Sequence, residues 1–111
     1  SNCNLAEAIF TRADLSEATL IGAKLCMTAF SYAVMIKADL SEVIIEGMVN
    51  FRWINAPNAK FKNIKNLAGA NFFEANLTEA DLEGSDFSQV GESDRTGTIF
   101  KGTIFEHLDN K

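Results

Sequence analysis

Residues 13–17 of the chain read Ala-Asp-Leu-Ser-Glu, and the same five residues recur as residues 38–42. Close variants stand at residues 75–79, Ala-Asn-Leu-Thr-Glu, and at residues 80–84, Ala-Asp-Leu-Glu-Gly. In each copy a small residue comes first, a large apolar residue stands at the centre, and mostly polar residues fill the other places. A five-residue unit with one fixed pattern therefore decides how this chain folds.

The apolar centre of the unit returns at every fifth position in the amino-terminal part of the chain: Leu5, Phe10, Leu15, Leu20, Leu25, Phe30, Met35, Leu40 and Ile45. A helix would return its apolar stripe at steps of three and four, and a strand at steps of two. A step of five therefore predicts a backbone that turns a corner once in every unit. The residue two places before the centre is small in most units, as at Ala8, Ala13, Ala18, Ala23, Ala33 and Ala38.

The register slips by one residue in two places, so that residues 43–48 and 64–69 form six-residue units. In the second of these, either Asn66 or Leu67 takes the centre. The five-residue pattern otherwise continues, with centres at Phe51, Ala56, Phe61, Phe72, Leu77, Leu82 and Phe87. Residues 91–97 are rich in Gly, Ser, Asp and Thr and predict a loop, after which two more units are centred on Phe100 and Phe105.

These units resemble the A-[DN]-L-x-x signature of the pentapeptide-repeat family, and the resemblance covers nearly the whole chain. It implies an all-β fold, a right-handed quadrilateral β-helix in which one unit forms one side of a coil. Residues 1–111 are then expected to form a single solenoid domain of about four to five coils, with a loop excursion near residues 91–97.

Residues about twenty apart should stack along the axis of such a helix at the strand spacing of roughly 4.8 Å. Counting through both six-residue units, the second side collects Phe10, Phe30, Phe51 and Phe72; the third collects Leu15, Met35, Ala56 and Leu77; the fourth collects Leu20, Leu40, Phe61 and Leu82. The extra residues are therefore predicted to bulge at corners without shifting the core. If residues 91–97 are also an excursion, Phe100 extends the phenylalanine column. Four glycines stand at or beside corners, where a positive φ is tolerated or required: Gly22, Gly47, Gly69 and Gly84.

The sequence offers no catalytic, cofactor or metal site. His107 is the single histidine and has no nucleophile motif around it, while Cys3 and Cys26 are too few for a metal cluster. Because the two cysteines occupy different places in the unit, no bridge between them is expected. We therefore expect a non-enzymatic protein without cofactor or metal, and predict a structural or protein-interaction module of unknown partner.

The formal net charge of −5, from 15 acidic and 10 basic residues, argues against direct binding of nucleic acid. An alternative comes from the family resemblance, since some members imitate duplex DNA and inhibit or protect DNA gyrase. Such mimicry requires a long continuous acidic surface. Here the fourth side alternates Asp39, Lys60 and Asp81, which favours ion pairing between coils instead.

One outward patch is a candidate interaction surface: Arg12, Tyr32, Arg52, Trp53 and Phe73. Arg12, Tyr32 and Trp53 occupy the last place of successive units on the second side, and Arg52 and Phe73 occupy the neighbouring place. Aromatic and arginine side chains are enriched in protein interfaces. The alternative is that Trp53 only covers a corner next to a six-residue unit.

The sequence shows no signal peptide and no apolar run long enough to span a membrane, so the cytoplasm is the default expectation, although no residue pattern fixes the compartment. The repeat starts within two residues of Ser1, which predicts an uncovered coil end. Three explanations remain open there: a fragment of a longer chain, a homodimer stacked through coil ends, or a tag remnant before a truncated repeat. At the other end, the polar residues from His107 to Lys111 are expected to form a modest cap.

Overall fold

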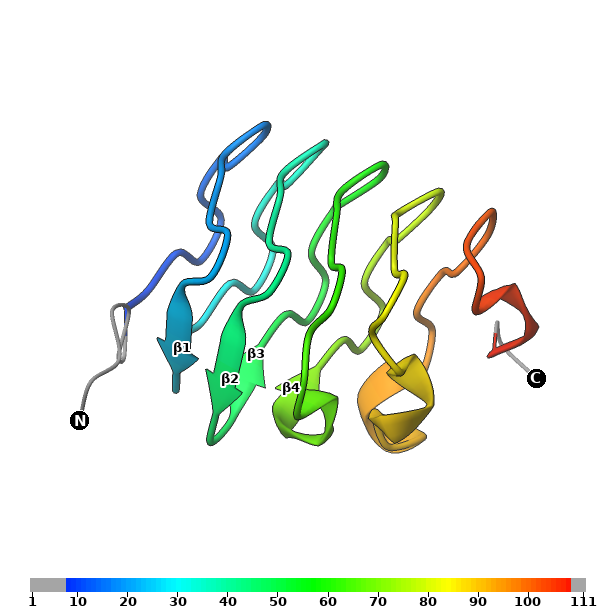
Figure 1. Cartoon of the computed structure of the whole chain (residues 1–111). Coiled ribbons are helices and arrows are strands. Elements are labelled where there is room, and N and C mark those ends of the chain that lie inside the picture. The colour runs from blue at the N-terminus through cyan, green and yellow to red at the C-terminus, as the bar shows by residue number, and fades with distance from the viewer. Residues whose placement is uncertain (1–7, 109–111) are drawn as a thin grey trace.

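The computed structural model describes residues 8–108, and these wind into a right-handed quadrilateral β-helix. Figure 1 shows the coils stacked side by side from the amino-terminal end on the left to the carboxy-terminal end on the right. Successive coils begin at residues 8, 28, 49, 70 and 93, as the pairing between neighbouring coils shows. The fold that the resemblance to pentapeptide repeats implies is confirmed.

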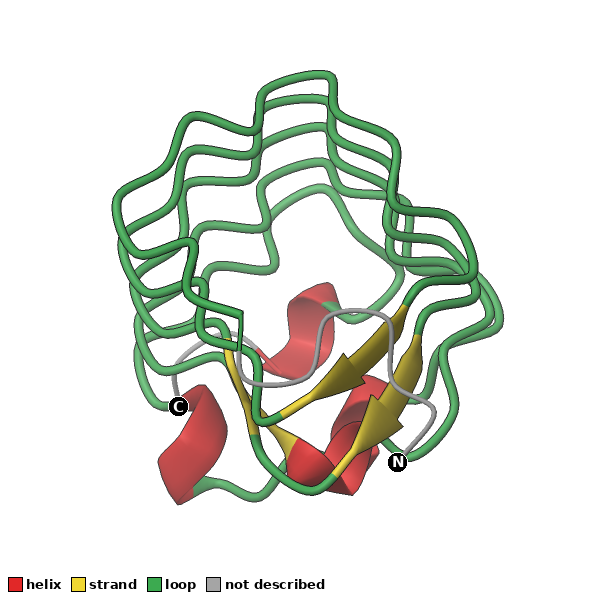
Figure 2. Cartoon of the chain, turned by 90° about the vertical axis from the view of Figure 1, so that its left-hand side faces the viewer, coloured by secondary structure: helices red, strands yellow, loops and turns green. Residues whose placement is uncertain are grey.

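Regular elements are short because each side of a coil is only a few residues long. Strand β1 (Lys24–Cys26) pairs in parallel with β2 (Ile44–Glu46), and β3 (Val49–Asn50) pairs in parallel with β4 (Ala70–Asn71). The 3-10 helices are η1 (Leu67–Gly69), η2 (Phe87–Gln89), η3 (Ser93–Arg95) and η4 (Glu106–Leu108). Viewed along the axis in Figure 2, the strands and the 3-10 helices gather on the lower side of the outline, and the other sides carry isolated bridges.

The extra residues all lie on the first side of a coil, which follows the fourth side of the preceding coil along the chain and includes residues 43–48 and 64–69. Parallel bridges join Thr19 to Asp39, then Asp39 to Lys60, and Lys60 to Asp81, so the fourth side keeps its register across both six-residue units. The third side does the same from Asp14 to Asn76. The prediction that the extra residues bulge without shifting the core columns is therefore confirmed. Residues 64–69 resolve their ambiguity, because Leu67 is fully buried and Asn66 is exposed.

The predicted position of Phe100 is wrong. Asn76 bridges to Ile99, and the Leu77 amide donates to the Ile99 carbonyl over 2.9 Å, so Phe100 continues the third-side column after Leu77. The second side of the last coil is formed by the segment that contains η3. There the amides of Phe72 and Glu74 donate to the carbonyls of Asp94 and Thr96. This segment has no apolar centre, because the half-buried Arg95 takes that place.

The backbone amides of one unit show why position two prefers Asp or Asn. In residues 38–42, the amides of Asp39, Leu40 and Glu42 donate to carbonyls of neighbouring coils, and the Ala38 amide closes the preceding corner. The Ser41 amide has no such partner and donates to Asp39 Oδ1 over 2.9 Å. The side chain in position two thus accepts the one amide that the coils leave unpaired. The amide two residues later donates in the same way to the Oδ1 of Asp14, Asn50, Asn71, Asn76, Asp81 and Asp86.

A column of phenylalanine rings runs through the core of the second side. Phe10 and Phe30 stack with centroids 5.2 Å apart, Phe30 and Phe51 stack at 5.0 Å, and Phe51 and Phe72 stack at 4.8 Å. In the inner coils the small residue of a unit is buried beside the large one, as Ala33, Ala38 and Ala75 are, whereas Ala13 and Ala18 in the first coil are half-buried. Aromatic stacking along the axis adds to the burial of apolar surface and stabilises the coils against sliding.

Two further observations bear on the sequence expectations. Cys26 is disulfide-bonded, so the expectation of unbridged cysteines is wrong for this residue. Cys26 lies on the first side, at the end of β1, and Cys3 lies outside the described residues. Within residues 8–108, no helix is long and apolar enough to cross a lipid bilayer.

Candidate functional site

The corner between the second and third sides carries the five residues predicted from the sequence, and the structure brings all five together. We call Arg12, Tyr32, Arg52, Trp53 and Phe73 the corner ladder. The amides of Arg12, Tyr32 and Trp53 donate to the carbonyls of Ser31, Arg52 and Phe73 in the next coil, over 2.9, 3.1 and 2.9 Å. Hydrogen bonds between coils therefore fix the position of each of these three residues along the solenoid axis.

The corner conformation turns the ladder side chains outward. Arg12, Tyr32 and Trp53 have φ angles of 64°, 62° and 59°, in the left-handed region that the third residue of a type II turn requires. The carbonyl of Phe30 accepts the Ala33 amide across this turn over 2.9 Å. With the backbone held this way, the last residue of each unit projects away from the core.

The aromatic rings of the ladder pack against one another. Tyr32 and Trp53 stack with centroids 4.8 Å apart and an interplanar angle of 7°, and Trp53 meets Phe73 edge to face at 5.5 Å. Pairs of this geometry contribute about 0.5–1.5 kcal/mol beyond the burial of their area. The Tyr32 and Trp53 rings thus cover each other's inner faces, and the three rings form a continuous ridge.

Two arginines complete the stack. The Arg12 Cζ lies 4.7 Å from the centroid of Tyr32, and the Arg52 Cζ lies 4.6 Å from that of Trp53 and 5.8 Å from that of Phe73. These are cation–π distances. Neither guanidinium forms an ion pair with a carboxylate of residues 8–108. The Arg52 Nε is also buried without a hydrogen-bond partner in this part of the chain.

The ladder remains accessible although its members pack together. Tyr32 is 43% exposed, Arg12 is exposed, and Arg52, Trp53 and Phe73 are half-buried. Sequence reasoning identified the residues from their places in the unit. It missed that each arginine would cover an aromatic face, because the direction of a long side chain depends on its neighbours in adjacent coils.

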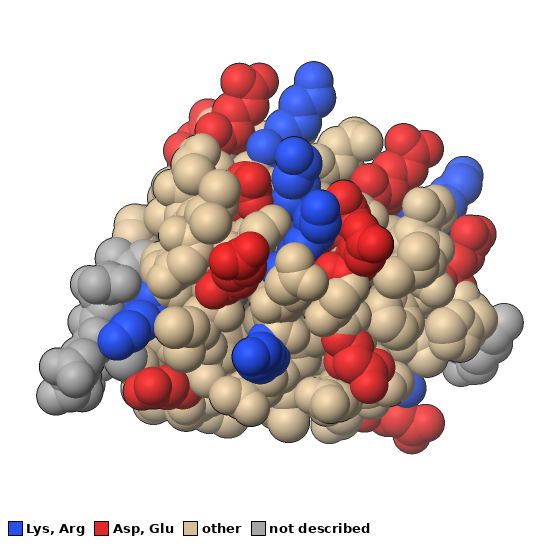
Figure 3. Space-filling view, viewed as in Figure 1, with Lys and Arg blue, Asp and Glu red and all other residues tan. Residues whose placement is uncertain are grey.

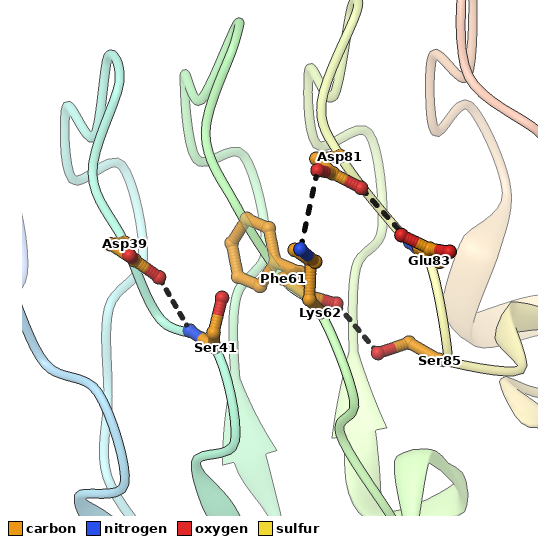
Figure 4. Close-up of polar contacts among 7 residues, drawn as sticks. All are labelled: Asp39, Ser41, Phe61, Lys62, Asp81, Glu83 and Ser85. Atoms are coloured by element: carbon orange, nitrogen blue, oxygen red, sulfur yellow. Dashed lines mark hydrogen bonds and ion pairs between the residues drawn. The ribbon is translucent and has the colours of Figure 1, made fainter.

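The fourth side carries a band of mixed charge, and Figure 3 shows basic side chains between acidic ones across the middle of the molecule. An ion pair joins Lys62 Nζ to Asp81 Oδ2 over 3.9 Å, as the close-up in Figure 4 shows. Burial raises the pKa of Asp39, but hydrogen bonds from Ser41 and the charges of Lys60 and Lys62 outweigh it, so the pKa of Asp39 is lowered from 3.8. The acids of this side are thus interleaved with lysines.

His107 and one groove lie outside the corner ladder. His107 is exposed, and its ring centroid lies 6.0 Å from that of Phe105. No group of three or more His, Cys, Asp or Glu side chains within residues 8–108 is placed to hold a metal ion. A shallow groove of about 420 Å³ lies on the corner between the fourth and first sides, lined by Glu42, Val43, Ile44, Ile45, Asn63, Lys65 and Asn66.

One comparison with a solved structure supports the fold. A pentapeptide-repeat protein from the thylakoid lumen of Arabidopsis thaliana matches with a TM-score of 0.68 and 20% identity, over 93% of this chain and 61% of that protein. This chain therefore spans less than two thirds of that relative. QnrB1, a plasmid-mediated fluoroquinolone resistance protein, matches with a TM-score of 0.44 and 15% identity, over 76% of this chain and 42% of QnrB1.

A third structure, the pentapeptide-repeat protein Rfr23 from the cyanobacterium Cyanothece 51142, matches with a TM-score of 0.32 and 20% identity, over 82% of this chain and 58% of that protein. Comparison with curated proteins finds no match. The family model described as pentapeptide repeats matches eight copies, over residues 1–28, 8–47 and 49–89. These matches cover most of the sequence, and the chain belongs to the pentapeptide-repeat family.

Proposed function

We propose that this protein is a non-catalytic binding module that contacts a protein partner through the corner ladder. The observation that carries the proposal is the pair of accessible arginines, each stacked on an aromatic ring and without a carboxylate partner among residues 8–108. Arginine, tyrosine and tryptophan are the residues that most often dominate the free energy of a protein interface.

The scaffold supports this role because the ladder is ordered before any partner binds. The amides of Arg12, Tyr32 and Trp53 donate to the next coil, and the rings of Tyr32 and Trp53 stack on each other. Binding then loses less side-chain entropy, which otherwise costs about 0.5–1.5 kcal/mol for each immobilised side chain. A rigid ridge of this kind suits a partner whose surface can adapt to it.

DNA mimicry is less well supported than protein binding. A DNA-like surface needs acids in an uninterrupted row, whereas Lys60 and Lys62 stand between Asp39 and Asp81 on the fourth side. A supercoiling assay with DNA gyrase checks this directly. Inhibition or protection of gyrase at stoichiometric concentrations would favour mimicry over the proposed function.

Affinity capture from a lysate of the source organism tests the proposal. The bait proteins are the wild type, the double variant Tyr32→Ala, Trp53→Ala, and a matched control with Ile44→Ala and Met48→Ala. The control removes apolar side chains that are 40% and 59% exposed on the first side. We expect a partner that the wild type and the control retain and the ladder variant loses. Equal capture by all three would place the contact elsewhere on the molecule.

A further inference from the structure

The chemistry of the ladder also indicates what kind of partner it accepts, and this step rests on the proposed function. We propose that the corner ladder binds an acidic segment in polyproline II conformation that runs along the solenoid axis, with two carboxylates three residues apart. Arg12 and Arg52 hold the carboxylates, and the aromatic edges between them contact the intervening apolar or proline residues.

The arginines have unused hydrogen-bonding capacity. A guanidinium that stacks on a ring with its face keeps its N–H donors in the plane, and these donors match the two oxygens of a carboxylate. In the described chain neither Arg12 nor Arg52 meets a carboxylate, and the Arg52 Nε is buried without a partner. An acidic ligand would supply acceptors to the accessible N–H groups of the two guanidiniums, but not to the buried Arg52 Nε.

The spacing of the arginines selects the separation of the carboxylates. Arg12 lies in the coil that begins at residue 8 and Arg52 in the coil that begins at residue 49, two coils further along. At roughly 4.8 Å a coil, the two positions are about 10 Å apart along the axis. A polyproline II segment rises about 3.1 Å per residue with three residues per turn, so residues three apart lie on one face about 9 Å apart.

The backbone of the solenoid favours recognition through side chains over strand addition. At the ladder, the amides of Tyr32 and Trp53 already donate to carbonyls of the next coil. The lateral face therefore offers no open row of amides to which a partner strand could add. Polyproline II segments have no internal backbone hydrogen bonds and are recognised through aromatic side chains, commonly in aromatic-lined grooves.

Glu74 limits where the acidic segment can lie. It takes the ladder place after Trp53, on the carboxy-terminal side, and it is exposed. A partner carboxylate near Glu74 would be repelled, so the acidic residues must sit over the part of the ladder between Arg12 and Arg52. This asymmetry gives the proposal a gain-of-affinity test.

Trp53 is the single tryptophan of the chain, so its fluorescence reports on the ladder directly. The probe is a blocked peptide, acetyl-Gly-Glu-Pro-Pro-Glu-Gly-amide, titrated at low salt against wild-type protein. Matched peptides replace both glutamates with glutamine or with lysine. We expect saturable binding of the glutamate peptide only, weakened by added salt because the contacts are ionic.

Variants separate this inference from folding effects. Arg12→Gln and Arg52→Gln should each weaken binding of the glutamate peptide by roughly ten-fold, since each variant loses one charge-assisted contact. Glu74→Gln should strengthen it, whereas Lys37→Gln, which removes an exposed cation on the next corner, should leave it unchanged. Thermal unfolding of each variant checks that the fold is intact.

The outcomes distinguish the inference from the proposed function. If the glutamine peptide binds as tightly as the glutamate peptide, or if Glu74→Gln has no effect, recognition of acidic segments is wrong. If a cellular partner is lost by the Tyr32→Ala, Trp53→Ala variant but retained by Arg12→Gln, Arg52→Gln, the ladder is a contact surface of another chemistry. Binding of the glutamate peptide without any captured protein would support the ligand class and count against the proposed cellular role.

Discussion

Most corners of this solenoid place a residue other than glycine at positive φ. Glu17, Lys37, Glu42 and Glu79 have φ angles between 56° and 63°, like the ladder residues Tyr32 and Trp53. This conformation costs an L-residue about 1–2 kcal/mol, so the fold accepts a repeated local cost in return for the hydrogen bonds between coils. The outward-pointing corner residues therefore have a backbone conformation that is unfavourable for L-residues.

Gly22 and Gly69 are needed for different reasons: Gly22 has a positive φ, and Gly69 is closely packed against the neighbouring coil. A Cβ on Gly22, with φ at 74°, would meet no atom within 4 Å, whereas a Cβ on Gly69 would lie 2.3 Å from the Gly47 carbonyl oxygen. We expect Gly22→Ala to lower the free energy of unfolding by about 1 kcal/mol through strain alone. Gly69→Ala should cost about 3 kcal/mol, because a backbone carbonyl of the neighbouring coil must move. Urea denaturation of both variants measures the difference, and equal losses would contradict this distinction.

Ser85 inserts its hydroxyl into a corner of the preceding coil. Its Oγ donates to the Phe61 carbonyl over 2.6 Å and accepts the Ile64 amide over 2.7 Å, and the residue is 2% exposed. Figure 4 shows the bond to Phe61. At other corners these two backbone groups bond directly, as Ala33 and Phe30 do.

We therefore expect Ser85→Ala to leave two buried backbone groups unpaired and to lower the free energy of unfolding by about 1–3 kcal/mol. Ser31→Ala, at a half-buried outward position, serves as the control and should have little effect. The measurement is the urea concentration at the midpoint of unfolding, compared between variants whose m-values are equal. An unchanged midpoint for Ser85→Ala would mean that the corner closes by a direct bond between Ile64 and Phe61.

At the scale of the element, the side-chain acceptor in position two links the sequence signature to pH. The pKa of Asp39 is lowered from 3.8, so the folded state holds its proton less tightly than the unfolded state. The stabilisation by ionised Asp39 is therefore present above about pH 3.8 and is lost as the pH falls through the lowered folded pKa. Asn can replace Asp as the acceptor for the Ser41 amide but does not titrate.

Asp39→Asn should consequently weaken the acid dependence of stability. At pH 6 the variant is expected to be less stable than the wild type, since it loses the attraction of Lys60 and Lys62. As the pH falls toward 2.5 this difference should shrink. Urea midpoints across this range provide the measurement, and Glu17→Gln controls for the loss of one exposed negative charge. A difference that stays constant with pH would contradict the assignment.

The first side is the element that absorbs changes in length. It holds the six-residue units at residues 43–48 and 64–69 and the longer segment at residues 85–92, while the third side keeps its register from Asp14 to Asn76. One glycine inserted after the exposed Gly91 should change the unfolding free energy by less than about 1 kcal/mol. The same insertion after Pro57, on the third side, should abolish cooperative unfolding because it shifts the core residues out of register. Equal tolerance of both insertions would mean that no side is preferred.

For the whole molecule, the resemblance to pentapeptide repeats implied the fold, and the five-residue period was sufficient to predict the columns of the second, third and fourth sides. It failed for Phe100, because the segment with η3 has no apolar centre and its register depends on hydrogen bonds to Phe72 and Glu74. The ladder residues could be predicted from the sequence, because their places in the unit determine which corner they share. The cation–π packing and the Ser85 insertion depend on contacts between coils that the period does not encode.

Stability in a solenoid comes from contacts between neighbouring coils, so position along the axis should decide what a core residue contributes. Phe51 is 1% exposed, stacks between Phe30 and Phe72, and meets Phe61 edge to face at 5.8 Å. Phe10 belongs to the same column but is half-buried, and Phe30 is its stacking neighbour within the described residues.

We expect Phe51→Ala to cost about 3–5 kcal/mol and to lower amide protection in the coils on both sides of it. Phe10→Ala should cost less and leave protection beyond the coil of Phe30 intact, because each coil transmits the loss only to its neighbours. Hydrogen exchange measured residue by residue resolves the two patterns. If Phe10→Ala lowered protection as far as Leu77, the molecule would unfold as one cooperative unit and the nearest-neighbour description would fail.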